Sequence, residues 1–480
     1  MSPHKLHTRD LLIHLDRSRV EPIGRQLEEE LRGAIRSGTL KAGCDLPSTR
    51  ALAEDLGVSR GVVGRAYAQL AGEGYVHLRQ GANPRVRTLP PLERRRAAPL
   101  EATTGPKVRY DLRAHLPEVT AFPRQAWLRS TRSALATAAS ADLSYLDPRG
   151  LHALRTEVSN YLGRARGVVA DPERVIITAG STHALSLIGR VLARGGSTAM
   201  AFENPSHLLL HAVAERAGQT PFAVPVDVNG LLVGRLGEAT SVVVSPAHQF
   251  PTGVILSADR RADLIRWARN TGGLIIEDDY DAEFRYDRAP IGALQGLSPE
   301  HVAYIGSTGK TLAPAIRLGW AVLPPDLFAL VSDELGLTML HVSGIDQLVF
   351  ADFLCRGEFD RHLRRMRAIY RSRRDVLVTA LATHLPDLRV SGIAAGLHVV
   401  LRLPSREIET AVRLRARSAG VLVQSLSQHA LPGYTGQAAL LIGYGSLPEP
   451  TLPAAIEQLA QAIRAVTRAP GANGSSYVAE

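Results

Sequence analysis

Ile305-Gly-Ser-Thr-Gly-Lys-Thr-Leu-Ala-Pro-Ala-Ile-Arg-Leu-Gly-Trp320 is the stretch around which the rest of the chain is organised. It continues a short apolar run, 303–306, which predicts a buried strand that ends at a glycine. A polar turn follows and carries Lys310, and Arg317 stands seven residues later. The apolar run 318–323 predicts a second strand. The stretch therefore predicts a lysine and an arginine between two buried strands.

These two side chains suit a cofactor with an aldehyde at one end and a phosphate at the other. A lysine amine forms an imine with an aldehyde, and the planar fork of an arginine donates two hydrogen bonds to a phosphate. Pyridoxal phosphate carries both groups. An ordinary loop with two solvated cations is the alternative, and this stretch alone does not decide between them.

The composition bounds the class of protein. A chain of 480 residues, 45% hydrophobic and 21% charged, is long enough for two or three soluble domains. It contains no run of eighteen apolar residues, and its first ten residues lack the apolar core of a signal peptide. Cys44 and Cys355 lie too far apart for a CxxC site, and the sixteen histidines show no metal-ligand spacing. We therefore expect a cytoplasmic protein with no metal site and no membrane contact.

The charge is distributed unevenly. The formal net charge is +10, and residues 1–100 hold 17 Lys and Arg against 11 Asp and Glu. A basic surplus at one end is typical of nucleic-acid binding, although solubility alone also explains it.

Residues 12–87 carry the signals of a helix-turn-helix. Apolar residues at every fourth position from Ile23 to Ile35 predict a first helix. Ser48 lies at the capping position of a second helix, 51–56, which Gly57 ends. Ser59 then caps a third helix, 60–71. Two short helices joined by such a turn form a helix-turn-helix, whose last helix reads the major groove of DNA.

Two alternating segments, 74–78 and 85–87, predict a hairpin after the third helix, a wing with a basic tip. The candidate DNA-contacting residues are Ser48, Thr49, Arg50, Ser59, Arg60, Arg65 and Arg79. We expect the two arginines of the third helix to face the groove and residues 48–50 to reach phosphates. A three-helix packing module without DNA is the alternative. The order of cap, turn, glycine and wing favours DNA binding.

Residues 88–108 predict a linker, because they contain four prolines, no apolar periodicity and the run Arg94–Arg96. That run can touch DNA phosphates or form a solvated patch. Residues 467–480 predict a flexible tail.

Residues 109–466 predict an α/β domain. From about residue 150, amphipathic stretches separate short apolar runs, which are 175–179, 197–203, 241–245, 274–278, 303–306 and 318–323. This alternation indicates a mostly parallel sheet, whose ligands gather at strand ends. After about residue 385 the pattern changes to strands at 397–403, 420–426 and 438–444 and helices at 405–418 and 449–466. We expect a large part, about 150–385, and a smaller α+β part, 386–466, joined by residues 110–145.

Two further strand ends carry polar groups. Ile177-Thr-Ala-Gly-Ser-Thr182 predicts a strand, a glycine turn and a helix start, whose free N–H groups attract an anion. Leu274-Ile-Ile-Glu-Asp-Asp-Tyr280 ends a strand in carboxylates and a phenol. A carboxylate opposite a pyridine nitrogen keeps that nitrogen protonated, so that the ring can accept electrons. An ordinary glycine turn and a solvated strand end are the alternatives.

Longer motifs resemble known families. Leu46-Pro-Ser-Thr-Arg-Ala-Leu-Ala-Glu-Asp-Leu-Gly-Val-Ser-Arg60 is similar to the winged helix-turn-helix domain of the bacterial GntR regulators. The order of four motifs resembles the fold-type-I aminotransferases, and these motifs are Tyr145–Gly150, Ser245–Gly253, Glu277–Tyr286 and Lys310–Arg317. The combination resembles the MocR/GabR regulators, over roughly residues 12–466.

The resemblance implies a role for each matching residue. Lys310 would hold the aldehyde of pyridoxal phosphate, Asp278 would face its pyridine nitrogen, and Tyr280 its ring hydroxyl. The residues implied to hold the phosphate are Gly180, Ser181, Thr182, Ser307 and Arg317. Tyr145 would reach the phosphate of a partner subunit, since the family forms homodimers with shared sites. His207 would stack on the cofactor where aminotransferases place an aromatic ring.

The chain departs from the aminotransferase pattern at several positions. Gly309 replaces a serine before the lysine, and Phe250 replaces an asparagine that bonds the ring hydroxyl. No arginine or lysine occurs from 418 to 463, the region from which aminotransferases take the arginine that binds a substrate carboxylate. Arg402 is the candidate nearest to it.

Three functions follow. The first is a bacterial, DNA-associated transcription regulator that binds an operator and senses an amine, an amino acid or pyridoxal phosphate itself. The second is a working aminotransferase, against which the depleted carboxylate pocket argues. The third is a regulator with a vestigial dimerisation domain, against which the intact lysine, aspartate, tyrosine and arginine argue.

Overall fold

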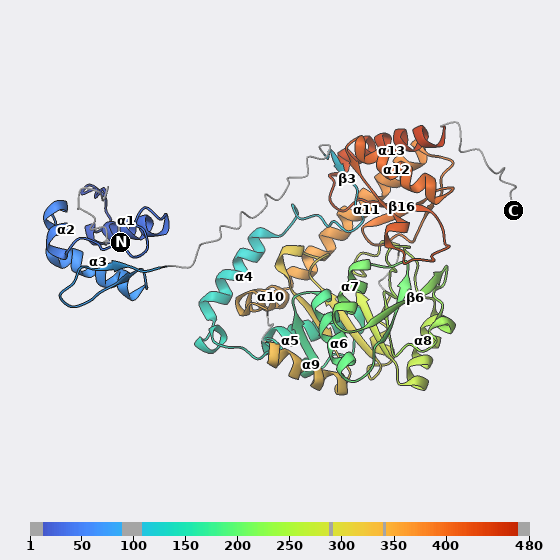
Figure 1. Cartoon of the computed structure of the whole chain (residues 1–480). Coiled ribbons are helices and arrows are strands. Elements are labelled where there is room, and N and C mark those ends of the chain that lie inside the picture. The colour runs from blue at the N-terminus through green and yellow to red at the C-terminus, as the bar shows by residue number, and fades with distance from the viewer. Residues whose placement is uncertain (1–12, 89–107, 288–290, 339–341, 469–480) are drawn as a thin grey trace. The chain divides into compact units, whose positions relative to one another are not determined.

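The computed structural model describes residues 13–88, 108–287, 291–338 and 342–468 (Figure 1). The chain divides into two compact units, residues 1–103 and 104–480. Most of the predicted linker, 89–107 with Arg94–Arg96, and most of the predicted tail, 469–480, lie outside the described residues.

The first unit contains three helices and a hairpin in the predicted order. They are α1 (Ile23–Arg36), α2 (Thr49–Leu56), α3 (Arg60–Gly72), β1 (Val76–His77) and β2 (Arg85–Val86). The strands pair antiparallel, with Val76 opposite Val86. The wing is therefore present, although its strands are shorter than the alternating segments indicated.

Local signals fix the helix-turn-helix. The Oγ of Ser48 accepts the N–H of Ala51 (3.2 Å) at the start of α2, and the Oγ of Ser59 accepts that of Val62 (3.4 Å) at the start of α3. Gly57, with φ of 60°, ends α2 in the left-handed conformation that glycine adopts without steric cost. The turn between the two helices therefore follows directly from the sequence.

One apolar core holds these helices together, with Leu27, Leu31, Val63 and Leu70 fully buried. The buried hydroxyl of Tyr67 donates to the carbonyl of Pro47 (2.9 Å), which ties α3 to the segment before α2. The orientation of α2 against α3 is thus set by packing and by one buried hydrogen bond.

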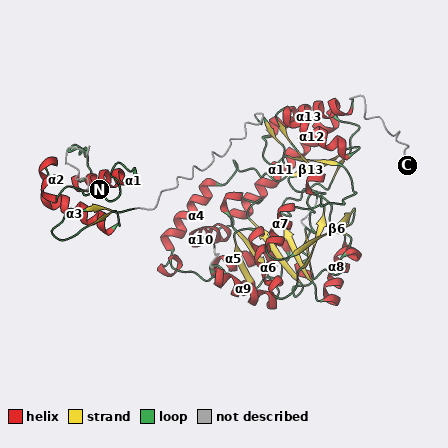
Figure 2. Cartoon of the chain, viewed as in Figure 1, coloured by secondary structure: helices red, strands yellow, loops and turns green. Residues whose placement is uncertain are grey.

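The second unit is built on an eight-stranded sheet (Figure 2). In spatial order its strands are β4 (Val175–Thr178), β11 (Gly319–Val322), β10 (Val302–Ser307), β9 (Leu274–Asp279), β8 (Ser241–Val244), β5 (Ala199–Asn204), β6 (Thr220–Asp227) and β7 (Gly230–Leu231). Neighbours from β10 to β6 pair in parallel, whereas β11 runs antiparallel to β10 and β4. The sheet is mostly parallel, as predicted.

Helices cover both faces of this sheet. Ile276 packs on one face with residues of α6 (Ser181–Arg194) and α9 (Pro325–Thr338). Its neighbour Ile275 packs on the other face with α8 (Ala258–Thr271). Because alternate residues of a strand point to opposite faces, continuous apolar strands are what a sheet buried on both sides requires.

Several helices were not predicted as individual elements. They are α4 (Arg124–Thr137), α5 (His152–Arg166), α7 (Leu208–Arg216), α9, α10 (Gly344–Cys355) and α11 (Glu358–His384). The last of these ends where the large part was predicted to end. α4 packs against α10, so the segment 110–145 contacts the large part.

The small part contains an antiparallel sheet of β12 (Val390–Ser391), β13 (His398–Arg402), β16 (Ala439–Gly443) and β15 (Gln424–Ser425). Its helices are α12 (Arg406–Ser418) and α13 (Leu452–Thr467). The single strand predicted at 420–426 is wrong. The chain there forms β14 (Val421–Leu422), which pairs with β3 (Tyr110–Asp111), and then β15, which pairs with β16. The N-terminal segment of the unit thereby joins the small part.

Candidate functional site

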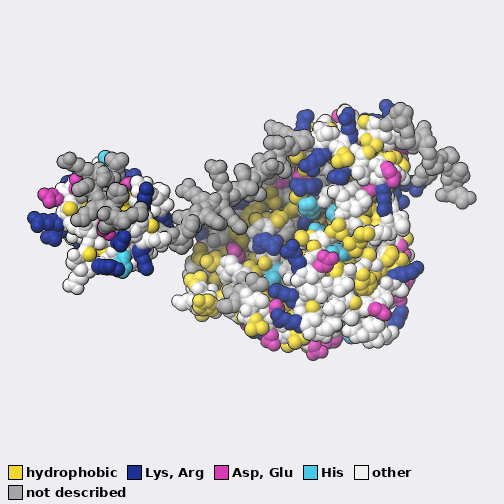
Figure 3. All heavy atoms as spheres, viewed as in Figure 1, with side chains coloured by type: hydrophobic (Ala, Val, Ile, Leu, Met, Phe, Trp, Pro, Cys, Tyr) yellow, Lys and Arg dark blue, Asp and Glu magenta, His cyan; other side chains and the backbone are white. Residues whose placement is uncertain are grey.

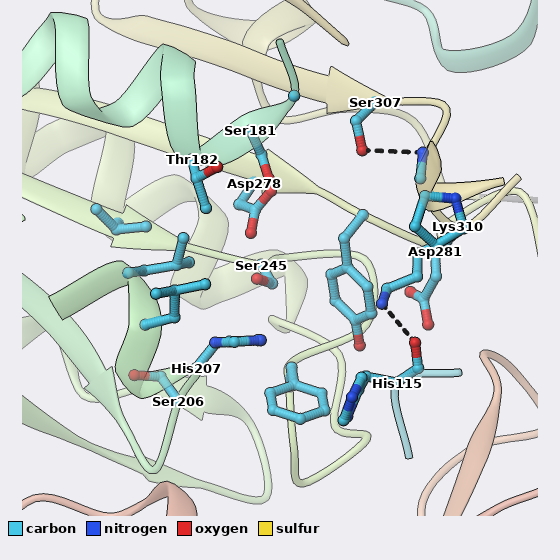
Figure 4. Close-up of a pocket in the computed structure, with 18 of the residues that line it drawn as sticks. His115, Ser181, Thr182, Ser206, His207, Ser245, Asp278, Asp281, Ser307 and Lys310 are labelled. Atoms are coloured by element: carbon cyan, nitrogen blue, oxygen red, sulfur yellow. Dashed lines mark hydrogen bonds between the residues drawn. The ribbon is translucent and has the colours of Figure 1, made fainter. Parts of the chain in front are cut away.

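Lys310 lies on a turn between β10 and β11. The turn is held by Thr308, whose N–H and Oγ1 both donate to the carbonyl of Leu318 (2.9 and 3.0 Å). The Nζ of Lys310 donates to the carbonyl of His115 (2.6 Å; Figure 4). Burial lowers the pKa of Lys310, against the opposite effect of Asp281 and Asp278. A buried amine with a lowered pKa is prepared to act as a nucleophile.

A cavity of about 220 Å³ opens around this lysine, where the carboxyl ends of β4, β5, β8, β9 and β10 meet. The predicted cofactor residues that line it are Gly180, Ser181, Thr182, His207, Asp278, Tyr280, Ser307, Lys310 and Arg317. Tyr145 does not line the cavity of its own chain, and 89% of it is exposed. The predicted cofactor residues that the cavity gathers lie up to 137 positions apart in the sequence, from Gly180 to Arg317.

Asp278 is the one carboxylate of its strand that faces the cavity without a partner. Glu277 accepts the N–H groups of Leu294 and Gln295 (both 2.9 Å), and Asp279 binds the buried Arg166 (2.7 Å). Strand alternation turns Asp278 the other way, where its Oδ1 is buried without a hydrogen-bond partner among the described residues. Burial, with the charges of neighbouring aspartates, raises the pKa of Asp278 to about 7.

The glycine turn before α6 forms the opposite end of the cavity. Gly180 precedes the helix with φ of 101°, and the first N–H groups of α6 have no partner within the helix. A side chain at Gly319 would lie 2.7 Å from the Cα of Gly180, so these two backbones approach too closely for any other residue. Free N–H groups and the positive end of the helix dipole suit a phosphate.

Arg317 completes this end from the β10–β11 connection. It is the one non-glycine residue of the described ranges with a positive φ, 54°. That conformation costs an L-residue about 1 kcal/mol. Arg317 lines the cavity and forms no ion pair with a described residue. A strained backbone and an unpaired guanidinium at a cavity indicate a binding role.

Tyr280 is oriented by a pair that the sequence analysis did not single out. The Nδ1 of His248 lies 2.9 Å from Asp281 Oδ2 and 3.0 Å from Tyr280 Oη. Because the carboxylate requires a donor, Nδ1 carries the hydrogen and Tyr280 accepts from it. Burial, and next the charge of Asp281, raises the pKa of Tyr280 well above its usual value. The phenol therefore stays protonated.

Aromatic and imidazole rings line the side of the cavity opposite the sheet. His115, His207 and Phe250 line it, with 5.6 Å between the ring centroids of His207 and Phe250. His429 lies behind Phe250, at 5.0 Å. Burial lowers the pKa of His115 and His207, and that of His429 to about 4. These imidazoles are uncharged at neutral pH.

The structure bears on two of the positions at which the sequence departs from the aminotransferase pattern. The N–H of Gly309 donates to the Oγ of Ser307 (3.4 Å). The backbone of residue 309 therefore helps to orient the hydroxyl of Ser307, although position 309 has no hydroxyl of its own. Arg402, the candidate for a substrate carboxylate, is exposed and lines a separate groove with Arg406. The structure therefore does not bring Arg402 to the cavity.

The candidate DNA-contacting residues lie on the first unit, whose visible face carries several basic side chains (Figure 3). Arg50, Arg60, Arg65 and Arg79 are exposed and form no ion pair with a described residue. Ser48 and Ser59 use their hydroxyls as helix caps. The arginines of α3 are thus free to bind an external anion.

Sequence reasoning missed several cavity residues, among them His115, Glu203 and Asp281, and it missed His248, which contacts Asp281 and Tyr280 from behind the lining. Two of them stand inside motifs that the sequence analysis quoted, because His248 precedes Phe250 by two positions and Asp281 follows Tyr280. Their proximity to other recognised residues was a usable signal. His115 has no such motif, since the pairing of β3 with β14 brings it to the cavity.

Together these observations define a class of protein, in which a helix-turn-helix DNA-binding unit is joined to an aminotransferase-like unit. A model of the bacterial regulatory proteins of the gntR family matches residues 23–86, and a model of aminotransferase class I and II matches residues 117–459. Proteins of the second family generally bind pyridoxal phosphate and are commonly dimeric. Within the described ranges, no helix is long and apolar enough to cross a membrane.

Curated relatives share both units. The chain is 31% identical to the HTH-type pyridoxine biosynthesis transcriptional regulator PdxR of Corynebacterium glutamicum, over 95% of this chain and 99% of that protein. It is 33% identical to the probable rhizopine catabolism regulatory protein MocR of Rhizobium meliloti, over 95% and 96%. An archaeal alanine:glyoxylate aminotransferase of known structure has a TM-score of 0.67 and 26% identity, over 75% of this chain and 92% of that one. The chain therefore belongs to the HTH-type transcriptional regulators with an aminotransferase-like domain.

Proposed function

We propose that this protein is a cytoplasmic, pyridoxal-phosphate-dependent transcription regulator that binds an operator as a homodimer and responds to a small amine-type effector. The observation that carries the proposal is the convergence of Lys310, Asp278, Tyr280 and Arg317 on one cavity. In the other unit, Arg60 and Arg65 are exposed on α3 and form no ion pair with a described residue. The proposed DNA-binding part is 12–87, followed by the linker 88–108 and the cofactor-binding part 109–466. The division of the chain near residue 103 supports these boundaries.

The residues of the cavity fit pyridoxal phosphate end to end. The partnerless Oδ1 of Asp278 suits a protonated ring nitrogen, and the hydrogen of Tyr280 suits the ring oxygen. The first turn of α6, Ser307 and Arg317 suit the phosphate. Lys310 supplies the amine that the aldehyde requires. When bound, the cofactor supplies an aldehyde carbon that reacts with amines and a ring that accepts electrons.

Each protein group then has a defined task. Asp278, ionised beside a cation, keeps the ring nitrogen protonated. His248 and Asp281 keep Tyr280 directed into the cavity. Lys310 would give up its bond to the carbonyl of His115 to hold the cofactor, and His115 follows β3, which pairs with β14 of the small part. This release offers a route from cofactor to conformation.

The dimer adds one residue to the proposed site. Tyr145 is 89% exposed and lies outside the cavity of its own chain. We propose that it reaches the phosphate in the partner subunit, as the family resemblance implies. A Tyr145→Phe variant with weaker cofactor binding and an unchanged dimer mass would support this role.

The test of the proposed function uses the purified full-length chain. Titration with pyridoxal phosphate should give an absorbance band that borohydride fixes to Lys310, and mass spectrometry locates the label. The same protein should bind DNA upstream of its own gene more tightly than random duplex of equal length. A protein that takes up no cofactor, or binds both duplexes equally, contradicts the proposal.

Amino transfer is the second candidate function, because Lys310 and Asp278 are the groups that a transaminase needs. The position of Arg402 outside the cavity disfavours it for amino-acid substrates. Incubation with an amino acid and a keto acid distinguishes the two, since sustained formation of a new amino acid would establish turnover.

A further inference from the structure

The cavity has an effector side that differs in character from its cofactor side. The effector side is formed by rings and aliphatic side chains, including Phe250 and Leu209, together with His115 and His207 (Figure 4). His115 comes from the segment after β3 and His207 from the start of α7. These side chains offer contact area to an apolar group.

With the cofactor bound, the positive side chains of the cavity are occupied, and the fixed charge that remains near the effector side is negative. Lys310 and Arg317 are the cations that line the cavity in the described part of the chain. In the proposed complex, Lys310 is used by the aldehyde and Arg317 by the phosphate. Asp278 faces the protonated ring nitrogen in that complex, so Asp281 is the carboxylate that remains, bound to His248 (2.9 Å).

The histidines do not supply the missing positive charge. Burial lowers the pKa of His115 and His207, and the Nδ1 of His207 is buried without a partner among the described residues. A carboxylate placed here would lose its hydration and meet uncharged imidazoles and carboxylates. Burying an ion without an opposite charge is strongly unfavourable.

We propose that the effector is a primary amine with an uncharged alkyl or aromatic body and no carboxylate. This inference rests on the proposed function, because it assumes the bound cofactor. The incoming amine takes the place of the Lys310 nitrogen on the aldehyde carbon. One carbon–nitrogen double bond replaces another, the protons lost by the amine pass to the released Lys310, and no oxidant or co-reactant is needed.

The test compares amines with the amino acids that differ from them by one carboxylate. Cofactor-loaded full-length protein is titrated with 2-phenylethylamine against L- and D-phenylalanine, with pentylamine against norleucine, and with propylamine against 4-aminobutyrate. The absorbance of the bound cofactor is the readout. We expect at least one amine to reach its half-maximal shift at a concentration at least tenfold lower than its acid. Equal or better action of the acids, or no shift with any compound, overturns the proposal.

A charge added to the wall tests the cause. Leu209 lines the cavity and is 53% exposed, so it tolerates a polar side chain. Leu209→Arg should lower the amine-to-acid preference at least tenfold, whereas Leu209→Gln should retain it. An unchanged preference in both variants overturns the electrostatic explanation. Absence of cofactor absorbance before any amine is added is a different result, which contradicts the proposed function itself.

Discussion

The two units of the chain place their chemistry in opposite ways. The candidate DNA-contacting arginines lie between residues 50 and 79, on exposed side chains without ion pairs to described residues. The cavity collects residues from 114 to 397, and burial displaces the pKa of several of them. Exposed contacts act almost independently, whereas buried groups that share one cavity depend on each other. Single substitutions should therefore cost more in the second unit, and a substitution among the DNA contacts should leave cofactor binding unchanged.

Lys310→Ala gives the largest expected effect. The borohydride-stable label should disappear, because no other lysine lines the cavity within the described ranges. Lys41→Ala, in the exposed part of the first unit, is the matched control and should label like the wild type. A borohydride-stable label on the Lys310→Ala protein would contradict the proposed site, since it would mean that an amine outside the cavity binds the cofactor.

Asp278→Asn should weaken cofactor binding by about 10- to 100-fold, because a hydrogen bond to a charged group contributes about 1.5–3 kcal/mol. The uncharged amide cannot pair with the positive charge of a protonated ring nitrogen, as the carboxylate of Asp278 can through its Oδ1, which has no partner among the described residues. Absorbance titration measures the change. Asp263→Asn, on the exposed face of α8, is the control, and equal loss in both variants would deny Asp278 a specific role.

Arg60→Ala should weaken operator binding by about tenfold, near the lower end of what one base-contacting arginine contributes. Gly61 and Gly64 give α3 few long side chains, so the loss should not be larger. Cofactor absorbance should stay unchanged. Arg25→Ala on α1, whose partner is Glu21, is the control in an electrophoretic mobility assay. A loss of cofactor in Arg60→Ala would show that the DNA contacts of the first unit and the cofactor site of the second unit depend on each other.

The sequence predicts the first unit almost completely, because its signals are local. Ser48, Gly57 and Ser59 lie within a few residues of the helix ends that they fix. The large sheet was predictable for the same reason, since strands buried on both faces are continuous apolar runs. The strand at 420–426 was not, because its two halves pair with partners from different parts of the chain.

The cavity was predictable where its residues belong to motifs and unpredictable where packing supplies them. Lys310 and Asp278 were found from strand ends. His115 follows β3, in which Tyr110 pairs with Val421 of β14, 311 positions later in the sequence. No motif near His115 predicts that it lines the cavity. The choice of Asp278 over Glu277 and Asp279 came from the family resemblance, and the structure supplies a physical reason for it, because the other two carboxylates already have partners.

Glu203→Gln should reveal burial directly. Burial raises the pKa of Glu203 to about 8, from an ordinary value near 4.5. The folded state therefore holds this proton more tightly than the unfolded state, so the associated stability is complete below pH 4.5 and is lost as pH rises through about 8. The glutamine has no proton to lose. A pKa displacement from 4.5 to about 8 corresponds to several kcal/mol, because one unit is about 1.4 kcal/mol. Between pH 5 and pH 9, the Tm of the cofactor-free variant should therefore fall by about 10 °C less than that of the wild type, since about 1 kcal/mol shifts Tm by roughly 2–4 °C. Calorimetry at both pH values measures this difference. Glu215→Gln, exposed on α7, should follow the wild type, and parallel curves for all three proteins would show that the ionisation of Glu203 does not affect folding.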